Sequence, residues 1–232
     1  MKKYFPHFSA EELLLWGAST GLILLAFFLF DRCEYLTLTA SLVGVTAILL
    51  NAKGNPAGQL LMILFSLLYG IISYTFSYYG EMITYLGMTM PMAVFSLVSW
   101  LRHPYNGKRS EVRIQRIRKK ERIFMLTLTL AVTVAFYFLL RYFHTAHLLP
   151  STISVTTSFL AVYLTFRRSP WFSLAYAAND IVLILLWALA VATDRRYLSV
   201  VVCFSAFCVN DIYSFLRWKK RELRQRKESG EA

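Results

Sequence analysis

Eight long apolar segments dominate the sequence and limit what this chain can fold into. They cover about residues 12–30, 35–50, 57–79, 82–101, 123–141, 151–166, 170–193 and 197–218. An α-helix needs roughly 20 apolar residues to cross the ~30 Å hydrocarbon layer of a membrane. Most of the segments reach that length, and the shorter second and sixth segments can span with a different tilt. The sequence therefore predicts an all-α polytopic membrane protein with about eight spanning helices.

The composition and the placement of charge agree with this class. Only 16% of the 232 residues are charged, whereas a soluble domain carries about 25%. If the N-terminus is placed in the cytoplasm, 21 of the 25 Lys and Arg residues lie on the cytoplasmic side. Such an asymmetry is typical of the positive-inside rule. We therefore expect a multi-pass protein of the cytoplasmic membrane with both termini inside, with membrane lipids as partners and no nucleic acid.

Two of the apolar segments end alike. Residues 95–100 and 213–218 each run from an aromatic residue, through a serine, to a tryptophan that positive charge follows. An echo of this kind suggests an internal repeat. It aligns the fourth segment with the eighth, the third with the seventh and the second with the sixth. Because the second and sixth segments run in the same direction, the two three-helix units are predicted to be parallel repeats, an arrangement found in transporters.

This alignment divides the chain into five parts. We predict an extra N-terminal helix in residues 1–34, a first three-helix repeat in 35–101, a basic cytoplasmic loop and linker helix in 102–141, a second repeat in 142–218, and a basic tail in 219–232.

Short motifs in both halves resemble the PnuC family of vitamin transporters. They lie at residues 50–55, 68–72, 79–82 and 90–92 in the first half, and at 167–168 and 210–218 in the second. The resemblance extends over about residues 35–220. It implies a SWEET-like fold, in which a linker helix joins two parallel three-helix units. It also implies uptake of nicotinamide riboside by facilitated diffusion, with cytosolic phosphorylation trapping the substrate, and relatives of this family carry thiamine or other vitamins and nucleosides.

One departure from the family pattern concerns the substrate. The family often has Trp-x-x-Trp-x-x-x-Asn at the start of the seventh segment, and here Ser173, Tyr176 and Asp180 occupy the aligned positions. If the alignment starts from Trp171 instead, Leu174 stands at the place of the second tryptophan.

Two aspartates are expected inside the apolar segments, and each follows an asparagine. They are Asp180, near the middle of the seventh segment, and Asp211 in the eighth. A charged group in hydrocarbon costs roughly 2.5–3.5 kcal/mol on insertion scales, so it needs an interior partner or a cavity. Ser173, Tyr176 and Asp180 share one helix face because they are spaced i, i+3 and i+7. An aromatic ring beside an acceptor suits a flat cationic heteroaromatic compound, although a structural hydrogen bond to another helix is the alternative.

The candidate residues form two sets. The predicted substrate-binding residues are Ser173, Tyr176, Asn179, Asp180, Asn210, Tyr213, Tyr69 and Trp171. Trp100 and Trp218 are predicted to anchor their helices at the membrane interface, with a cytoplasmic gate as the alternative. No metal site and no cofactor are expected, because the sequence has no phosphate loop, nucleophile elbow or zinc-protease motif.

The leading functional hypothesis is import of nicotinamide riboside by alternating access around a midplane site between the third, fourth, seventh and eighth segments. A transporter of thiamine or of another vitamin or nucleoside is an alternative, as is a proton-coupled symporter that uses Asp180. A lipid-modifying membrane enzyme is a further alternative from another class. A homo-oligomer is left open.

Overall fold

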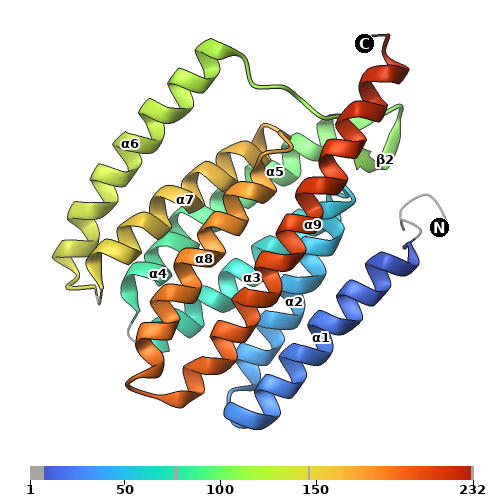
Figure 1. Ribbon diagram of the computed structural model, residues 1–232. Helices are drawn as coiled ribbons and strands as arrows, with labels where there is room; N and C mark the ends of the chain where they lie inside the picture. The colour runs from blue at the N-terminus through green and yellow to red at the C-terminus, as the bar shows by residue number, and fades with distance from the viewer. Residues whose placement is uncertain (1–7, 76–77, 146, 231–232) are drawn as a thin grey trace.

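The computed structural model describes residues 8–75, 78–145 and 147–230, and within these ranges it is a bundle of long helices (Figure 1). The helices are α1 (Ala10–Phe30), α2 (Tyr35–Ala52), α3 (Ala57–Thr75), α4 (Tyr79–Thr84), α5 (Met90–Arg102), α6 (Lys119–Tyr142), α7 (Leu148–Phe166), α8 (Phe172–Val191) and α9 (Leu198–Glu228). In the described ranges, eight helical segments are long and apolar enough to cross a membrane. The predicted all-α polytopic class is confirmed.

One of the eight spans is irregular in its middle. Residues Tyr79–Arg102 form a single span, in which the π-helical turn η1 (Tyr85–Thr89) joins α4 to α5. Pro91 follows this turn, and proline can neither donate a backbone hydrogen bond nor fit a regular helix beside the preceding turn. A single π-helical turn inside an α-helix often occurs at a functional site. Here it turns Tyr85 and Thr89 toward the centre of the bundle, where they line a cavity.

Six helices form a closed ring. Each packs on the next in the order α2, α3, α5, α7, α8 and α9, and α9 returns to α2. Helix α1 lies outside the ring against α2 and α9, and α6 lies outside against α7 (Figure 1). The two predicted three-helix units, α2–α3–α5 and α7–α8–α9, are therefore the two halves of this ring.

Two tryptophans tie the halves together. The Nε1 of Trp218 in α9 donates a 2.8 Å hydrogen bond to the carbonyl of Asn51, near the end of α2. The Nε1 of Trp100 in α5 donates a 2.9 Å hydrogen bond to the carbonyl of Thr165, near the end of α7. The two indole rings lie 5.5 Å apart, and each is at most 1% exposed. The prediction that these tryptophans are membrane-interface anchors is therefore wrong, because both are buried between helices.

Helices α2 and α7 end with the same backbone motif. After each helix, a residue with positive φ (Gly54 at 68° and Arg168 at 54°) reverses the chain. The next residue, Asn55 or Ser169, donates its backbone N–H to a carbonyl five residues earlier. A proline follows each motif. A duplicated unit would carry such a shared ending, and the duplication itself stays a prediction.

Arg168 adopts the left-handed backbone that suits glycine, which strains an L-residue by about 1–2 kcal/mol. Its guanidinium offsets this cost by reaching the Ser99 hydroxyl at 2.7 Å and the Gln115 side-chain oxygen at 2.5 Å. Burial lowers the pKa of Arg168 to about 10, so the guanidinium stays charged at neutral pH. Arg168 thus joins the end of α5, the start of α8 and the segment before α6.

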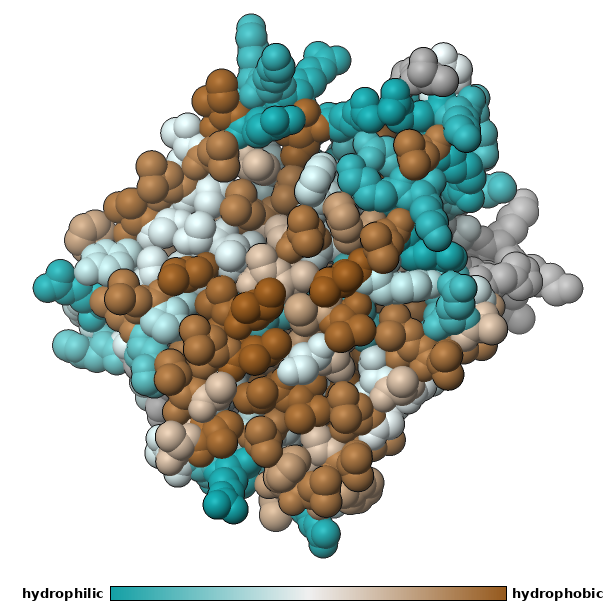
Figure 2. Space-filling model, viewed as in Figure 1, coloured by the Kyte–Doolittle hydropathy of each residue, from teal (hydrophilic) through white to brown (hydrophobic). Residues whose placement is uncertain are grey.

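Hydrophilic side chains gather at the end of the bundle where α9 finishes (Figure 2). A small hairpin of β1 (Pro104–Tyr105) and β2 (Lys108–Val112) lies there, and Glu111 pairs with Arg221 and Arg224 of α9. The predicted basic tail is thus partly a continuation of α9 rather than a separate segment. We call this end of the bundle, where α9 finishes, the basic end. The start of α1 lies at the same end (Figure 1), whereas Lys2 and Lys3, which the charge count places there, lie outside the described residues.

The crossed tryptophan bonds lead to a stability prediction. Trp100→Phe and Trp218→Phe should each lower the melting temperature of the purified protein by about 2–4 °C, because each removes a buried hydrogen bond worth about 1 kcal/mol. Thermal unfolding in detergent measures this. Trp171→Phe is the control, since the Trp171 ring is half exposed and should tolerate the change within about a degree. Equal melting temperatures for all three variants would contradict the structural role.

Candidate functional site

A cavity lies at the centre of the six-helix ring, with about 520 Å³ of space between atoms when the solvent-open part is included. The cavity is lined by Gly44, Ile48 and Asn51 of α2, Met62 and Phe65 of α3, Tyr85 and Thr89 of η1, Ser158 of α7, Phe172, Tyr176, Asn179 and Asp180 of α8, and Phe204, Phe207 and Asp211 of α9. All of these residues are buried except Tyr176, which is partly exposed. Both halves of the ring contribute side chains.

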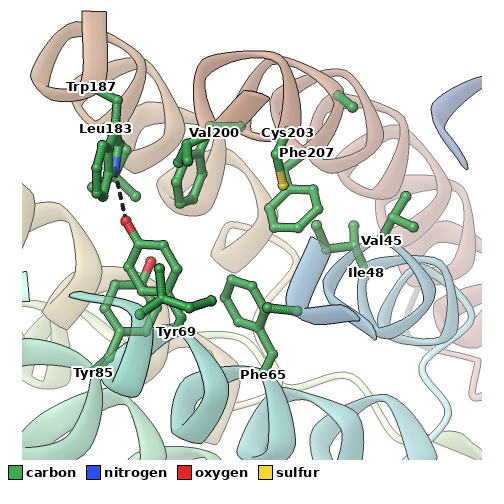
Figure 3. Close-up of a cluster of buried hydrophobic side chains, with 14 of the residues drawn as sticks. Val45, Ile48, Phe65, Tyr69, Tyr85, Leu183, Trp187, Val200, Cys203 and Phe207 are labelled. Carbon is green, nitrogen blue, oxygen red and sulfur yellow. Dashed lines mark hydrogen bonds between the residues drawn. The ribbon is translucent and has the colours of Figure 1, made fainter. Parts of the chain in front are cut away.

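Aromatic rings make up much of the cavity lining, and Figure 3 shows three of them, Phe65, Tyr85 and Phe207. The Phe65 ring meets Phe207 edge-on at 5.6 Å and Tyr85 at 6.0 Å. Gly44 makes this packing possible, because a Cβ at that position would lie 2.3 Å from the Cζ of Phe207. Aromatic rings offer flat apolar faces, and those faces also attract cations.

Two carboxyl groups also line the cavity. Asp180 of α8 and Asp211 of α9 lie within hydrogen-bonding reach of each other, and each side chain is 4% exposed. The Asp180 Oδ2 has no hydrogen-bond partner among the described residues. Two adjacent carboxylates repel each other in a buried site, so a proton or a cation between them is needed to stabilise the pair.

Amide and hydroxyl groups complete the polar lining. The Asn179 amide lies 2.8 Å from the hydroxyl of Thr157 and 2.9 Å from that of Ser158. The Gln59 amide donates a 2.8 Å hydrogen bond to the Asn51 side chain. Thr89 presents a buried hydroxyl that has no partner within the described part of the chain. The cavity thus offers oriented amides and a free hydroxyl beside the carboxyl pair.

Three of the predicted substrate-binding residues meet in this cavity, namely Tyr176, Asn179 and Asp180. The others do not line it. Ser173 is fully buried and its hydroxyl lies 2.8 Å from that of Ser214. The Asn210 amide donates a 2.7 Å hydrogen bond to Ser19 of α1. Ser173 and Asn210 thus pack helices and do not line this cavity, and their role in substrate binding stays a prediction.

Tyr69, Trp171 and Tyr213 also lie away from the cavity. The Tyr69 hydroxyl accepts a 2.7 Å hydrogen bond from the Trp187 indole (Figure 3). The Tyr69 ring packs against that of Tyr85, with 4.4 Å between the ring centres. Trp171 is half exposed, and the Lys219 ammonium lies 4.6 Å from the centre of its ring. Tyr213 is partly exposed on α9 and does not line the cavity.

Several lining residues were missed by the sequence reasoning. On α9, Phe204, Phe207 and Asp211 are spaced i, i+3 and i+7, the same spacing that selected Ser173, Tyr176 and Asp180 on α8. Successive helical residues point about 100° apart, so α9 can turn Asp211 toward the cavity while the adjacent Asn210 meets α1. The periodicity around Asp211 was the signal that could have identified this face.

The expectation that Asp180 and Asp211 are the only carboxylates in the apolar segments is wrong, because the predicted segment 82–101 begins one residue too late to include Glu81 and the observed span is Tyr79–Arg102. Glu81 lies in α4 rather than in a loop and is only 1% exposed. Its carboxyl group lies within hydrogen-bonding reach of Ser154 in α7, and it does not line the cavity. Gly80 permits close packing here, because a Cβ at that position would lie 2.6 Å from the Cγ2 of Thr145.

Aromatic side chains close both ends of the cavity. Toward the basic end, Phe172 lines the cavity and packs at 4.8 Å on Trp218, which in turn contacts Trp100. Toward the other end, Trp187 packs against Tyr69 and, at 4.7 Å, against Tyr78. Each closure combines rings from both halves of the ring of helices. Within the described residues, no group of three or more His, Cys, Asp or Glu side chains is placed to hold a metal ion.

Comparisons with known proteins agree on one family. The family model described as "Nicotinamide mononucleotide transporter" matches residues 34–220. The nicotinamide riboside transporter PnuC of Neisseria mucosa is 24% identical over 222 residues, which are 93% of this chain and 82% of that protein. A crystal structure of the vitamin B3 transporter PnuC has the same fold, with a TM-score of 0.84 at 21% identity over 97% of each chain. The chain therefore belongs to the nicotinamide mononucleotide transporter family, a family of membrane transporters rather than enzymes.

Proposed function

We propose that the chain imports nicotinamide riboside by facilitated diffusion and that the central cavity is its binding site. The observation that carries the proposal is a central cavity lined by aromatic rings and by Asp180 beside Asp211. The nicotinamide ring of the riboside is a flat pyridinium cation. Aromatic faces attract such a cation, and a buried carboxylate supplies its counter-charge.

The charge of the lining favours the riboside over the mononucleotide. None of the described residues that line the cavity is Lys, Arg or His. A phosphate group needs basic side chains or helix N-termini to replace its water, and the two aspartates would repel it. The riboside carries hydroxyl groups instead. The amides of Asn51 and Asn179 and the hydroxyl of Thr89 can form hydrogen bonds with them.

Transport through this site requires each aromatic closure to open in turn. We place the basic end in the cytoplasm, because Lys and Arg residues concentrate on that side. Substrate then enters past Tyr69, Tyr78 and Trp187 and leaves past Trp100 and Trp218. Trp100 and Trp218 thus act as a gate in this proposal. Their hydrogen bonds to the opposite half would have to break as the halves rock apart, which is the alternating access expected of repeat transporters.

The role of the carboxyl pair can be tested with two ligands that differ in charge. Asp180→Asn and Asp211→Asn should weaken binding of nicotinamide riboside by about tenfold to 100-fold, because a charge-assisted contact contributes about 1.5–3 kcal/mol. Binding of the reduced riboside, whose ring is uncharged, should change much less. Calorimetry on the purified protein measures both affinities.

A matched control for these variants is Glu228→Asn, since Glu228 is an exposed carboxylate at the end of α9. It should leave both affinities unchanged. If Asp180→Asn and Asp211→Asn weakened the two ligands equally, the aspartates would support the fold of the site rather than recognise the cation. Uptake of nicotinamide riboside by cells should fall in the variants that bind it more weakly. Asp180→Ala and Tyr176→Ala should be inactive in uptake.

The identity of the substrate can be tested by a stability screen against nicotinamide riboside, nicotinamide mononucleotide, thiamine and riboflavin. A ligand at 100 times its dissociation constant stabilises the folded state by about 2.7 kcal/mol. We expect nicotinamide riboside to raise the melting temperature and the mononucleotide to leave it unchanged. A shift with thiamine and none with the riboside would transfer the assignment to thiamine, the alternative cationic vitamin.

A proton-coupled symporter is the second candidate, and the contact between Asp180 and Asp211 favours it. Paired carboxyl groups can exchange one proton as the site changes access. In liposomes with a pH gradient, facilitated diffusion predicts that riboside uptake is unaffected by a proton uncoupler. A fall of tenfold or more in accumulation with the uncoupler would instead establish coupling, and loss of that sensitivity in Asp211→Asn would place the proton on this pair.

A further inference from the structure

A second cleft lies at the basic end, outside the six-helix ring. It lies between the start of α6, the loop before α8 and the cytoplasmic part of α9, with about 1100 Å³ of open space. Its lining residues are Arg116, Ile117, Arg122, Met125, Leu164, Ser169, Pro170, Trp171, Lys219 and Glu222. Figure 1 shows α6 diverging from the other helices toward this end. The cleft is separate from the central cavity, with which it shares no lining residue.

The cleft carries an excess of positive charge. Three cations line it, Arg116, Arg122 and Lys219, against one carboxylate, Glu222. Arg116 and Lys219 each pair with one oxygen of Glu222, at 3.1 and 3.0 Å. Arg122 is exposed and has no acidic partner among the described residues. An anion placed between Arg122 and Lys219 would therefore meet a net positive wall.

The same cleft has an apolar side that continues onto the lipid-facing surface. Met125 and Leu164 form buried parts of its lining, and Trp171 is half exposed at its edge with Lys219 above the ring. Directly after Arg122, Ile123 and Phe124 are 68% and 59% exposed. The cations of the cleft would lie at the level of the lipid headgroups, Trp171 at the interface, and the exposed apolar residues at the level of the acyl chains.

We propose that this cleft binds the headgroup of an anionic phospholipid, with the phosphate between Arg116, Arg122 and Lys219 and the acyl chains along the start of α6. Basic clefts between helices on the cytoplasmic side suit anionic headgroups. A zwitterionic lipid would bring a second positive charge into a cleft that already has an excess. A soluble phosphate would leave the apolar side, with Met125 and Leu164, without a partner. The site lies beside α6, the helix that joins the two halves.

The test measures lipid binding to the full chain in detergent, by native mass spectrometry and by thermal unfolding. The probes are phosphatidylglycerol, phosphatidylcholine and glycerol 3-phosphate. Phosphatidylglycerol should stay bound and raise the melting temperature, whereas phosphatidylcholine should do so at least tenfold less well. Glycerol 3-phosphate, which has the same phosphate without acyl chains, should neither shift the melting temperature nor displace the lipid at equal concentration.

The cleft variant is Arg122→Gln with Lys219→Gln, and the matched control is Arg102→Gln with Lys220→Gln. The control removes the same charge from exposed positions at the same end but outside the cleft. We expect the cleft variant to lose the preference for phosphatidylglycerol and the control to keep it. Because Arg122 has no acidic partner to leave behind, the single variant Arg122→Gln provides a folded test if the double variant is unstable.

Two outcomes would overturn the proposal. An equal loss in the cleft variant and the control would mean that general surface charge attracts the lipid. Displacement of phosphatidylglycerol by equal glycerol 3-phosphate would mean that the cleft takes a soluble phosphate rather than a lipid.

Discussion

The arrangement of the whole bundle depends on two hydrogen bonds that cross between its halves. Trp218 of α9 donates to a carbonyl near the end of α2, and Trp100 of α5 donates to a carbonyl near the end of α7. Both indole rings are buried between helices, so neither N–H can find water and an unpaired one would cost about 1–3 kcal/mol. The bonds therefore hold α9 on α2 and α5 on α7, which are the two contacts that close the ring of six helices.

This crossed packing also explains why the central cavity is closed toward the basic end. Phe172 packs on Trp218 and lines the cavity, so the side chains that join the halves also close the basic end of the site. A rearrangement that opens that end has to act on the same contacts that hold the halves together. In the proposed transport cycle, one cluster of rings therefore both supports the bundle and controls access to the site.

The polar residues of the cavity follow from the same membrane constraint. Asp180 and Asp211 lie on neighbouring helices and face each other, and Asn179 is held by hydroxyl groups of α7. Each of these groups would be costly against lipid. Packing collects them in an interior cavity that Phe65 and Phe207 also line. A cationic, partly polar solute suits that mixture better than either a hydrocarbon or an anion does.

The sequence predicted part of this site, and particular residues show where the prediction stopped. Asp180 and Tyr176 were identified because a charge and a ring share one face of an apolar helix. Asn210 was chosen and Asp211 was left out of the substrate-binding set, since composition does not say which side of α9 meets α1. Trp100 and Trp218 have the sequence context of interface anchors, and nothing local distinguishes such a tryptophan from one buried against a distant helix end. Glu81 fell just outside the predicted segment 82–101, because nothing local shows whether the Gly80-Glu81 pair lies in a loop or in a helix.

By itself, the sequence determined the class, the eight spans, the family and the two unusual aspartates. These properties depend on the length of apolar runs, on motifs and on the cost of charge in hydrocarbon, all of which are local. Only the tertiary structure decided that Asp180 meets Asp211, that Ser173 and Asn210 pack helices, and that the paired tryptophans lie in the interior. The physical reason is that the direction of a side chain repeats every 3.6 residues of a helix, whereas the identity of its partner depends on which distant helix packs beside it.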